Sequence, residues 1–203
     1  MEPRKLIEAM AVAERLKNNT RHSYTTTGRK ESVAEHSWRL ILLAYFVSDE
    51  FKDIDLEKLM KMCLIHDLGE AFTGDIPSFL KNDDDEEREN RLLAEWVSSL
   101  PSPFCNEMND LYNEMNPLRT KEARIYKALD NMEAVIQHNE ADISTWIPLE
   151  YELNLTYGED KAEFSPYLKG LRALLRDDSI RKISDAKNDN DKSGGCHCFV
   201  SQM

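Results

Sequence analysis

The sequence predicts an all-α protein built as a single helical bundle. Apolar residues recur at intervals of three and four, as in Leu6, Ile7, Met10 and Ala13, which is the spacing of one helix face. The chain has only seven glycines and seven prolines, whereas an all-β chain needs turn residues about every 8–12 positions. Its 203 residues suffice for one substantial core and are too few for two large ones.

The apolar periodicity divides the chain into helices separated by polar segments. Ser32 and Glu35 have the spacing of a capping box, in which each side chain accepts from a free backbone N–H, so a helix should begin there. Asp55 caps the next helix, which we expect to end before Gly69. Residues 18–30 are polar and are expected to form a loop. The predicted helices cover residues 3–17, 32–47, 55–67, 87–99, 104–114, 120–138, 146–157 and 161–176.

The composition changes near the C-terminus. The chain is polar from Ser184 onward, which predicts a folded domain over residues 1–180 and a disordered tail over 181–203. The tail contains Cys196, His197 and Cys198, all of metal-ligand type. Three residues in an unstructured end cannot enclose an ion, so we do not expect a metal site there.

The formal net charge of −12 limits the partners of the protein. It argues against binding to nucleic acid or to an anionic membrane surface, because both depend on clustered lysine and arginine. A small phosphorylated substrate remains possible, since one arginine and a metal can reverse the field inside a cleft. The eight-residue apolar run Leu40–Val47 is too short for a membrane span, and no signal peptide is visible. We therefore expect a cytoplasmic protein.

Four residues form a candidate metal site: His36, His66, Asp67 and Asp130. Two imidazoles and two carboxylates suit one divalent ion, whether Mn²⁺, Co²⁺, Fe²⁺, Zn²⁺ or Mg²⁺. Asp130 lies within an apolar helix, where a lone carboxylate would be costly without a cation. The alternative for Asp130 is a solvated ion pair with Lys127.

Two further carboxylates follow the His-Asp pair. Glu70 lies four residues after His66, so it faces the same cavity if the helix continues, and Asp75 comes five residues later. Hydrolysis requires such groups, one to hold the attacking water and one to protonate the leaving oxygen. The alternative for Glu70 is a surface position in a loop.

The series His36, His66-Asp67, Asp130 resembles that of the HD-domain phosphohydrolase superfamily. The stretch from His66 to Pro77 resembles its 5′-deoxynucleotidase branch, and the resemblance covers about residues 5–175. The N-terminal part of the same resemblance consists of Arg15-Leu16-Lys17, then Arg21, then Ser32-Val33-Ala34-Glu35-His36-Ser37.

This resemblance implies a homodimeric, metal-dependent phosphomonoesterase that removes the 5′-phosphate from (deoxy)nucleoside monophosphates through a metal-activated water. It implies that Arg21 binds the phosphate, Glu70 positions the water and Asp75 serves the leaving 5′-oxygen. Close relatives usually carry tryptophan after this arginine, at the sugar. Here that substrate-binding position is His22, a smaller polar ring that could admit a ribose hydroxyl.

Three alternatives remain open from the sequence. The protein could be an HD hydrolase of a nucleoside triphosphate or an alarmone, or a non-catalytic module that binds metal or nucleotide. A two-metal oxygenase is disfavoured, because no histidine lies between Asp67 and Asp130. We also expect His138 at a solvent-facing helix end, and Trp38, Trp96 and Trp146 in the core.

Overall fold

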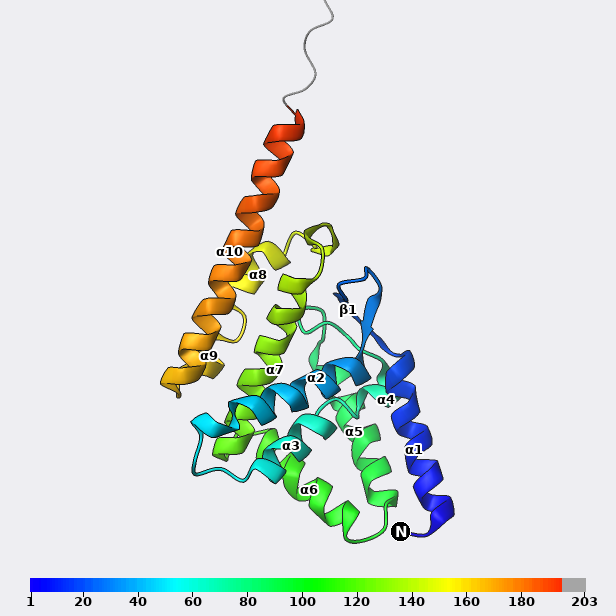
Figure 1. The fold of residues 1–203 in the computed structure, drawn as a ribbon. Helices are drawn as coiled ribbons and strands as arrows, with labels where there is room; N and C mark the ends of the chain where they lie inside the picture. The colour runs from blue at the N-terminus through cyan, green and yellow to red at the C-terminus, as the bar shows by residue number, and fades with distance from the viewer. Residues whose placement is uncertain (195–203) are drawn as a thin grey trace, which may run out of the picture.

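Three helices that contact one another form the centre of the molecule: α2 (Val33–Val47), α3 (Leu56–Ile65) and α7 (Lys121–Glu140). In the computed structural model, which describes residues 1–194, the other elements surround this centre (Figure 1). The side chains packed at the centre are aliphatic and fully buried, and they include Leu40, Leu59, Met62, Ile125, Leu129 and Met132. The prediction of an all-α fold is confirmed.

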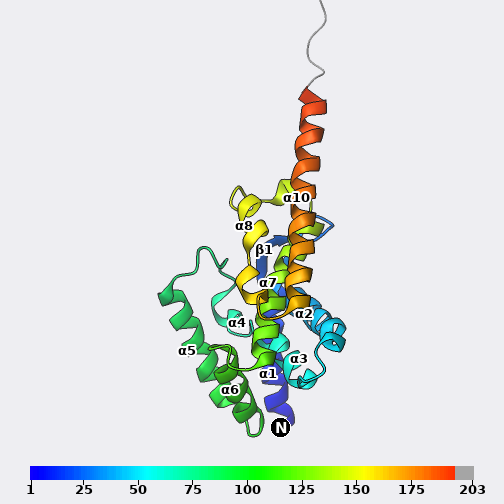
Figure 2. The same cartoon turned by 90° about the vertical axis from the view of Figure 1, so that its left-hand side faces the viewer.

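The remaining elements cover the two sides of the central helices. Helices α5 and α6 contact each other on one side, and α10 packs against α7 and α8 on the other (Figure 2). Helix α1 contacts α2 and α4. The bounds of these elements are α1 (Pro3–Asn18), β1 (Thr20–Tyr24), β2 (Lys30–Ser32), η1 (Ser48–Glu50), α4 (Glu70–Thr73), α5 (Asp83–Ser99), α6 (Phe104–Met115), η2 (Ile143–Thr145), α8 (Glu150–Thr156), α9 (Glu159–Ala162) and α10 (Pro166–Gly194).

The helix starts follow the capping signals in the sequence. Ser32 and Glu35 form the predicted capping box at the start of α2, and Asp55 accepts from the backbone N–H of Lys58 at the start of α3. A second capping box, between Asn82 and Asp85, begins α5 earlier than the predicted residue 87. These contacts are local, so the sequence predicts them well.

The predicted loop over residues 18–30 instead contains an antiparallel hairpin. Strands β1 and β2 pair Thr20 with Ser32 and Tyr24 with Lys30, and the turn between them includes Gly28 at a φ of +81°. The strands are polar, so they lack the alternation that would mark them in the sequence. A side-chain amide of Gln137 on α7 donates to the Tyr24 carbonyl oxygen at 2.6 Å, which holds the hairpin against the domain.

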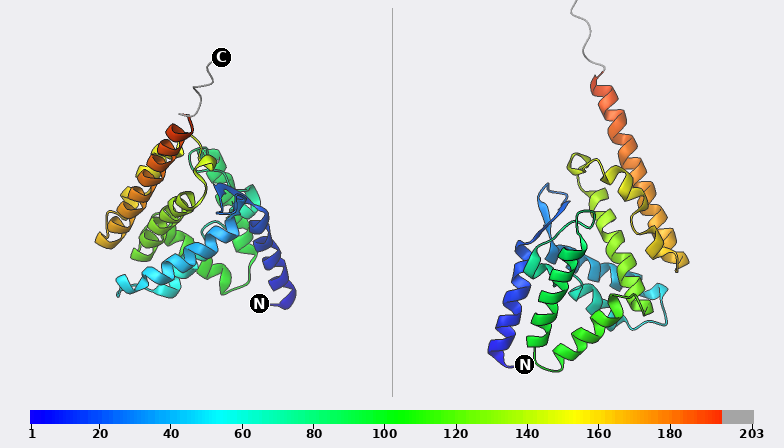
Figure 3. Two further views of the ribbon diagram at one scale, coloured as in Figure 1. Left: turned by 45° about the horizontal axis from the view of Figure 1, so that its top comes forward. Right: turned by 180° about the vertical axis from the view of Figure 1, so that it is seen from behind.

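The C-terminal region differs from the predicted tail. Helix α10 continues to Gly194, so the expected boundary at residue 181 lies inside a helix that extends beyond the rest of the fold (Figure 3). No glycine or proline interrupts the sequence between Gly170 and Gly194, and Asp178 and Arg181 form an ion pair one turn apart. The segment Cys196-His197-Cys198 lies outside the described residues.

One of the three tryptophans departs from the expected core position. The Trp38 side chain on α2 is 63% exposed, whereas Trp146 is buried. Trp38 lines a surface pocket together with Lys17, Thr20 and Arg29. Among residues 1–194, no helix combines the length and the apolar character needed to cross a membrane.

Candidate metal centre and active site

The four predicted ligands come together from three parts of the fold. His36 lies in the second turn of α2, His66 and Asp67 follow the end of α3, and Asp130 lies in the middle of α7. The Nε2 atom of His36 is 3.2 Å from Nε2 of His66 and 3.1 Å from Oδ1 of Asp130. Oδ2 of Asp67 lies 2.9 Å from Nε2 of His66 and 3.8 Å from that of His36. The ligand atoms of His36, His66 and Asp67 lie within 4.8 Å of one another, and Oδ1 of Asp130 lies beside both imidazole nitrogens.

The hydrogen bonds behind the two imidazoles determine which nitrogen faces the other ligand atoms. Nδ1 of His36 contacts the buried carboxylate of Glu133, and Nδ1 of His66 lies 2.9 Å from the Cys63 carbonyl oxygen. Both partners are acceptors, so each Nδ1 carries a proton and each Nε2 of a neutral ring presents a lone pair.

The arrangement fits a divalent ion. Two lone pairs and two carboxylate oxygens face one another, and ligands about 2.1 Å from an ion would lie about 3–3.4 Å apart. Burial opposes the charged form of His66, but Asp67 and Asp130 outweigh that effect and raise its pKa to about 10. Without a cation between them, the two carboxylates therefore hold a proton on this imidazole, a positive charge that a bound metal ion would replace.

Asp130 also makes the ion pair that was considered as an alternative. Nζ of Lys127 lies 2.8 Å from Oδ2 of Asp130, while Oδ1 faces the imidazoles. Burial opposes ionisation, but Lys127, His36 and His66 hold the pKa of this carboxyl well below its usual range. The two contacts use different oxygens, so the ion pair does not remove Asp130 from the cluster.

Arg21 contributes a buried cation to the same cavity, which has a volume of about 440 Å³. Its guanidinium lies 3.9 Å from both Glu31 and Glu133, beyond ordinary hydrogen-bond distance, and its buried Nη1 has no hydrogen-bond partner. An anion with oxygen acceptors would satisfy this donor.

Glu70 and Asp75 line the cavity beside the cluster. Glu70 is the first residue of α4, and its Oε2 atom is buried without a hydrogen-bond partner. Burial, together with Asp67 and Asp75, raises the pKa of Glu70 to about 9, and burial also raises the pKa of Asp75. Of the two expectations for Glu70, the cavity position is the one observed.

Two buried carboxylates beside His36 and Arg21 were not predicted from the sequence. Glu133 is fully buried one turn after Asp130, and the buried Glu31 accepts from the Ser23 hydroxyl at 3.0 Å. The spacing of Glu133 from Asp130 on one helix was the available signal. Glu31 gave no local signal, because its partners are reached only through the hairpin.

His138 was expected at a solvent-facing helix end, and this expectation is wrong. The residue is only 7% exposed and lines the cavity together with His22. The indole N–H of Trp146 donates to the His138 carbonyl oxygen, so the segment after α7 folds back over this helix end. His22 lies on β1, with Nε2 2.8 Å from Oε1 of Glu150.

Comparison with known sequences gives a consistent set of relatives. The HD domain family profile matches residues 13–172. The 5′-deoxynucleotidase HDDC2 of Dictyostelium discoideum is 28% identical over 141 residues, which cover 64% of this chain and 74% of the relative. Its namesake in Danio rerio is 27% identical over 163 residues, covering 79% of this chain and 80% of the relative.

Two solved structures share the fold. A protein from Magnetospirillum magnetotacticum, described as a predicted metal-dependent phosphohydrolase, has a TM-score of 0.73 and 26% identity, covering 88% of this chain and 94% of its own. A conserved hypothetical protein from Pyrococcus furiosus has a TM-score of 0.65 and 28% identity, covering 84% of this chain and 98% of its own.

The role of Glu133 can be tested through metal affinity. We expect Glu133→Ala to weaken binding of Co²⁺ by roughly 10–100-fold, because His36 loses the acceptor that fixes its tautomer. Glu133→Gln keeps an oxygen acceptor and should lose less. Affinity is measured by competition with a chelator. Glu140→Ala, at an exposed position of the same helix, is the matched control, and equal affinities in all four proteins would contradict this role.

Proposed function

Because the chain belongs to the HD domain family, we propose that it removes the 5′-phosphate from deoxynucleoside and nucleoside monophosphates. It is a metal-dependent nucleotide phosphohydrolase, in line with its relatives. The finer proposal is supported by one observation above others. A buried arginine donor without a hydrogen-bond partner shares a cavity with a convergent set of metal-ligand atoms.

In this proposal one divalent ion is held by His36, His66, Asp67 and Asp130. When bound, such an ion lowers the pKa of a water molecule and polarises a phosphoryl oxygen. Glu133 and the Cys63 carbonyl oxygen keep the two imidazoles oriented. The native metal depends on cellular supply as well as on the ligands, so Mn²⁺, Co²⁺, Fe²⁺, Zn²⁺ and Mg²⁺ all remain candidates.

The other cavity residues take separate roles. Arg21 binds the phosphate with its free donor and compensates the charge that develops on the phosphoryl oxygens. Glu70 positions the attacking water through its unpartnered oxygen. Asp75 follows Gly74, whose φ is +79°, and serves the leaving 5′-oxygen. A carboxyl with a raised pKa suits that last role, because it holds a proton more readily.

The sugar preference follows from His22. Its ring lies edge-on to Phe79 at 5.4 Å between centroids and leaves the cavity wider than a tryptophan would. Its Nε2 atom faces Glu150 rather than a substrate. We therefore propose that the 2′-hydroxyl is tolerated, so deoxynucleotides and ribonucleotides are both accepted.

The first test is phosphate release from dAMP and AMP by metal-stripped protein reconstituted with Co²⁺ or Mn²⁺. We expect the rates of phosphate release from the two substrates to lie within about tenfold of each other, because one small contact to the sugar changes the selectivity only modestly. Asp67→Asn should abolish release and also reduce the thermal stabilisation produced by the ion, since bound metal favours the folded state.

Each rival function has its own outcome in this assay. Release from dAMP alone would retain the phosphatase and overturn the sugar tolerance. Activity only on triphosphates or pyrophosphorylated nucleotides would indicate another HD hydrolase. Binding without turnover would indicate a sensing module, and dependence on oxygen would indicate an oxygenase.

Variants at Glu70 and Arg21 separate the chemical step from binding. We expect Glu70→Gln to retain metal but to lower kcat at least about 100-fold, because the amide oxygen can still accept a hydrogen bond but cannot take a proton from the attacking water. Arg21→Ala should mainly raise KM, through the lost charge-assisted contact to phosphate. Arg29→Ala, at an exposed position of the same hairpin, is the control. A near-normal kcat in Glu70→Gln would exclude its assigned role.

We further propose that the protein is a homodimer in the cytoplasm. The side chains of Trp38, Tyr45 and Phe46 on α2 and of Leu64 on α3 are more than half exposed, and exposed apolar groups of this size are typical of an interface. We expect light scattering to give twice the chain mass, and Phe46→Asp to shift the mass to that of a monomer while the circular dichroism is unchanged. A monomeric parent protein would contradict the dimer.

A further inference from the structure

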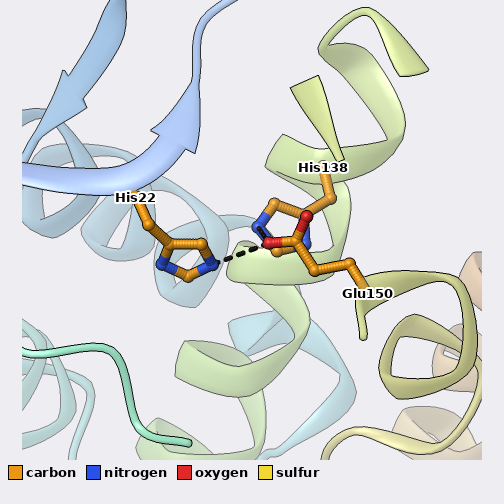
Figure 4. Close-up of side chains that lie close together, drawn as sticks. All are labelled: His22, His138 and Glu150. Atoms are coloured by element: carbon orange, nitrogen blue, oxygen red, sulfur yellow. Dashed lines mark ion pairs between the residues drawn. The ribbon is translucent and has the colours of Figure 1, made fainter. Parts of the chain in front are cut away.

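A second cluster of metal-ligand types lies at the edge of the same cavity and shares no residue with the first. His22 comes from β1, His138 from the last turn of α7 and Glu150 from the start of α8, and the three side chains point toward one another (Figure 4). Oε1 of Glu150 is 2.8 Å from Nε2 of His22 and 3.4 Å from Nε2 of His138. All three atoms lie within 4.8 Å of one another.

Contacts outside the cluster fix two of the three side chains in this orientation. Nδ1 of His138 donates to Oδ1 of Asn154 at 2.8 Å, so Nε2 of the neutral ring presents its lone pair to the cluster. The other carboxylate oxygen of Glu150 accepts from the backbone N–H of Ile147 at 2.8 Å, which directs Oε1 at the two imidazoles. Such outer contacts are typical of protein metal ligands.

The two imidazole nitrogens of the cluster lack well-formed hydrogen bonds. Neither Nε2 of His22 nor Nε2 of His138 makes a hydrogen bond of ordinary geometry, although both atoms are buried. An acceptor on His138 faces an acceptor on Glu150, and this arrangement is unfavourable unless a cation lies between them.

We propose that His22, His138 and Glu150 form a second site for a divalent cation, of the kind that Zn²⁺ occupies. Two histidines and one glutamate are a known zinc set, and four-coordinate zinc separates ligands 2.1 Å away by about 3.4 Å. His22 and His138 line the cavity, so the remaining coordination position faces the space where substrate or water enters. This proposal does not depend on the phosphatase activity, since it concerns binding alone.

The test counts ions in the full chain. Cys196 and Cys198 are first replaced by serine, so that thiolates at the C-terminal end do not add to the count. The stripped protein is titrated with Co²⁺ and Zn²⁺, the stoichiometry is measured by calorimetry, and the visible absorption of Co²⁺ reports its ligand geometry. We expect two ions per chain.

Variants assign the second ion to this cluster. Glu150→Gln and His22→Gln should each reduce the count from two ions to one, whereas Asp67→Asn should remove the other ion and leave the Co²⁺ spectrum of this site. Glu152→Gln removes the same charge from an exposed position of the same helix and should keep two ions. His22 is partly exposed, so its variant remains informative if Glu150→Gln fails to fold.

Two results would overturn the proposal. One ion per chain, with an unchanged Co²⁺ spectrum in His22→Gln, would make the contact between His22 and Glu150 a simple ion pair. Loss of all metal in Asp67→Asn would show that His22, His138 and Glu150 hold no ion of their own.

Discussion

The meeting of four acceptor atoms at the centre of the helical core is the constraint on which the rest of the structure depends. His36, His66, Asp67 and Asp130 come from α2, the end of α3 and α7, the three helices that also form the main core. Acceptors this close repel one another unless a cation lies between them. In the proposed metal site, the aliphatic packing of these helices and the binding of a cation would stabilise the same arrangement, so that metal affinity and folding would be thermodynamically linked.

Local signals account for the part of the fold that was predictable. The capping box at Ser32 and the cap at Asp55 act within three residues. Helical periodicity is also local, because it depends only on which residues three and four positions apart are apolar. The hairpin over residues 20–32 depends on pairing between polar strands and on Gln137, which is more than a hundred residues away. The polar composition after Ser184 predicts disorder, but no helix breaker lies between Gly170 and Gly194, so α10 continues to Gly194.

Some residues of the candidate site could likewise be predicted from the sequence, and others could not. The sequence alone shows that His36, His66, Asp67 and Asp130 are of residue types that bind metal ions, whatever their separation along the chain. The roles of Glu31 and Glu133 were not visible, because a buried carboxylate has meaning only beside the cation or imidazole that it contacts. His138 was misjudged for the same reason. Its helix position looked exposed, and only the return of the chain at Trp146 buries it.

The charge of the protein poses a problem that Arg21 resolves. A chain of net charge −12 must attract an anionic substrate, yet its surface carboxylates act weakly beyond a Debye length of about 8–10 Å. Burial disfavours the charged guanidinium, but Glu133, Asp67 and Glu31 keep the pKa of Arg21 above its ordinary value, so it remains charged inside the cavity. The 3.9 Å contacts to Glu31 and Glu133 are close enough to hold it electrostatically and too long to use its hydrogen bonds. The Nη1 donor therefore stays available to an anion in the cavity, which supports the proposed phosphate-binding role of Arg21 despite the net charge of the chain.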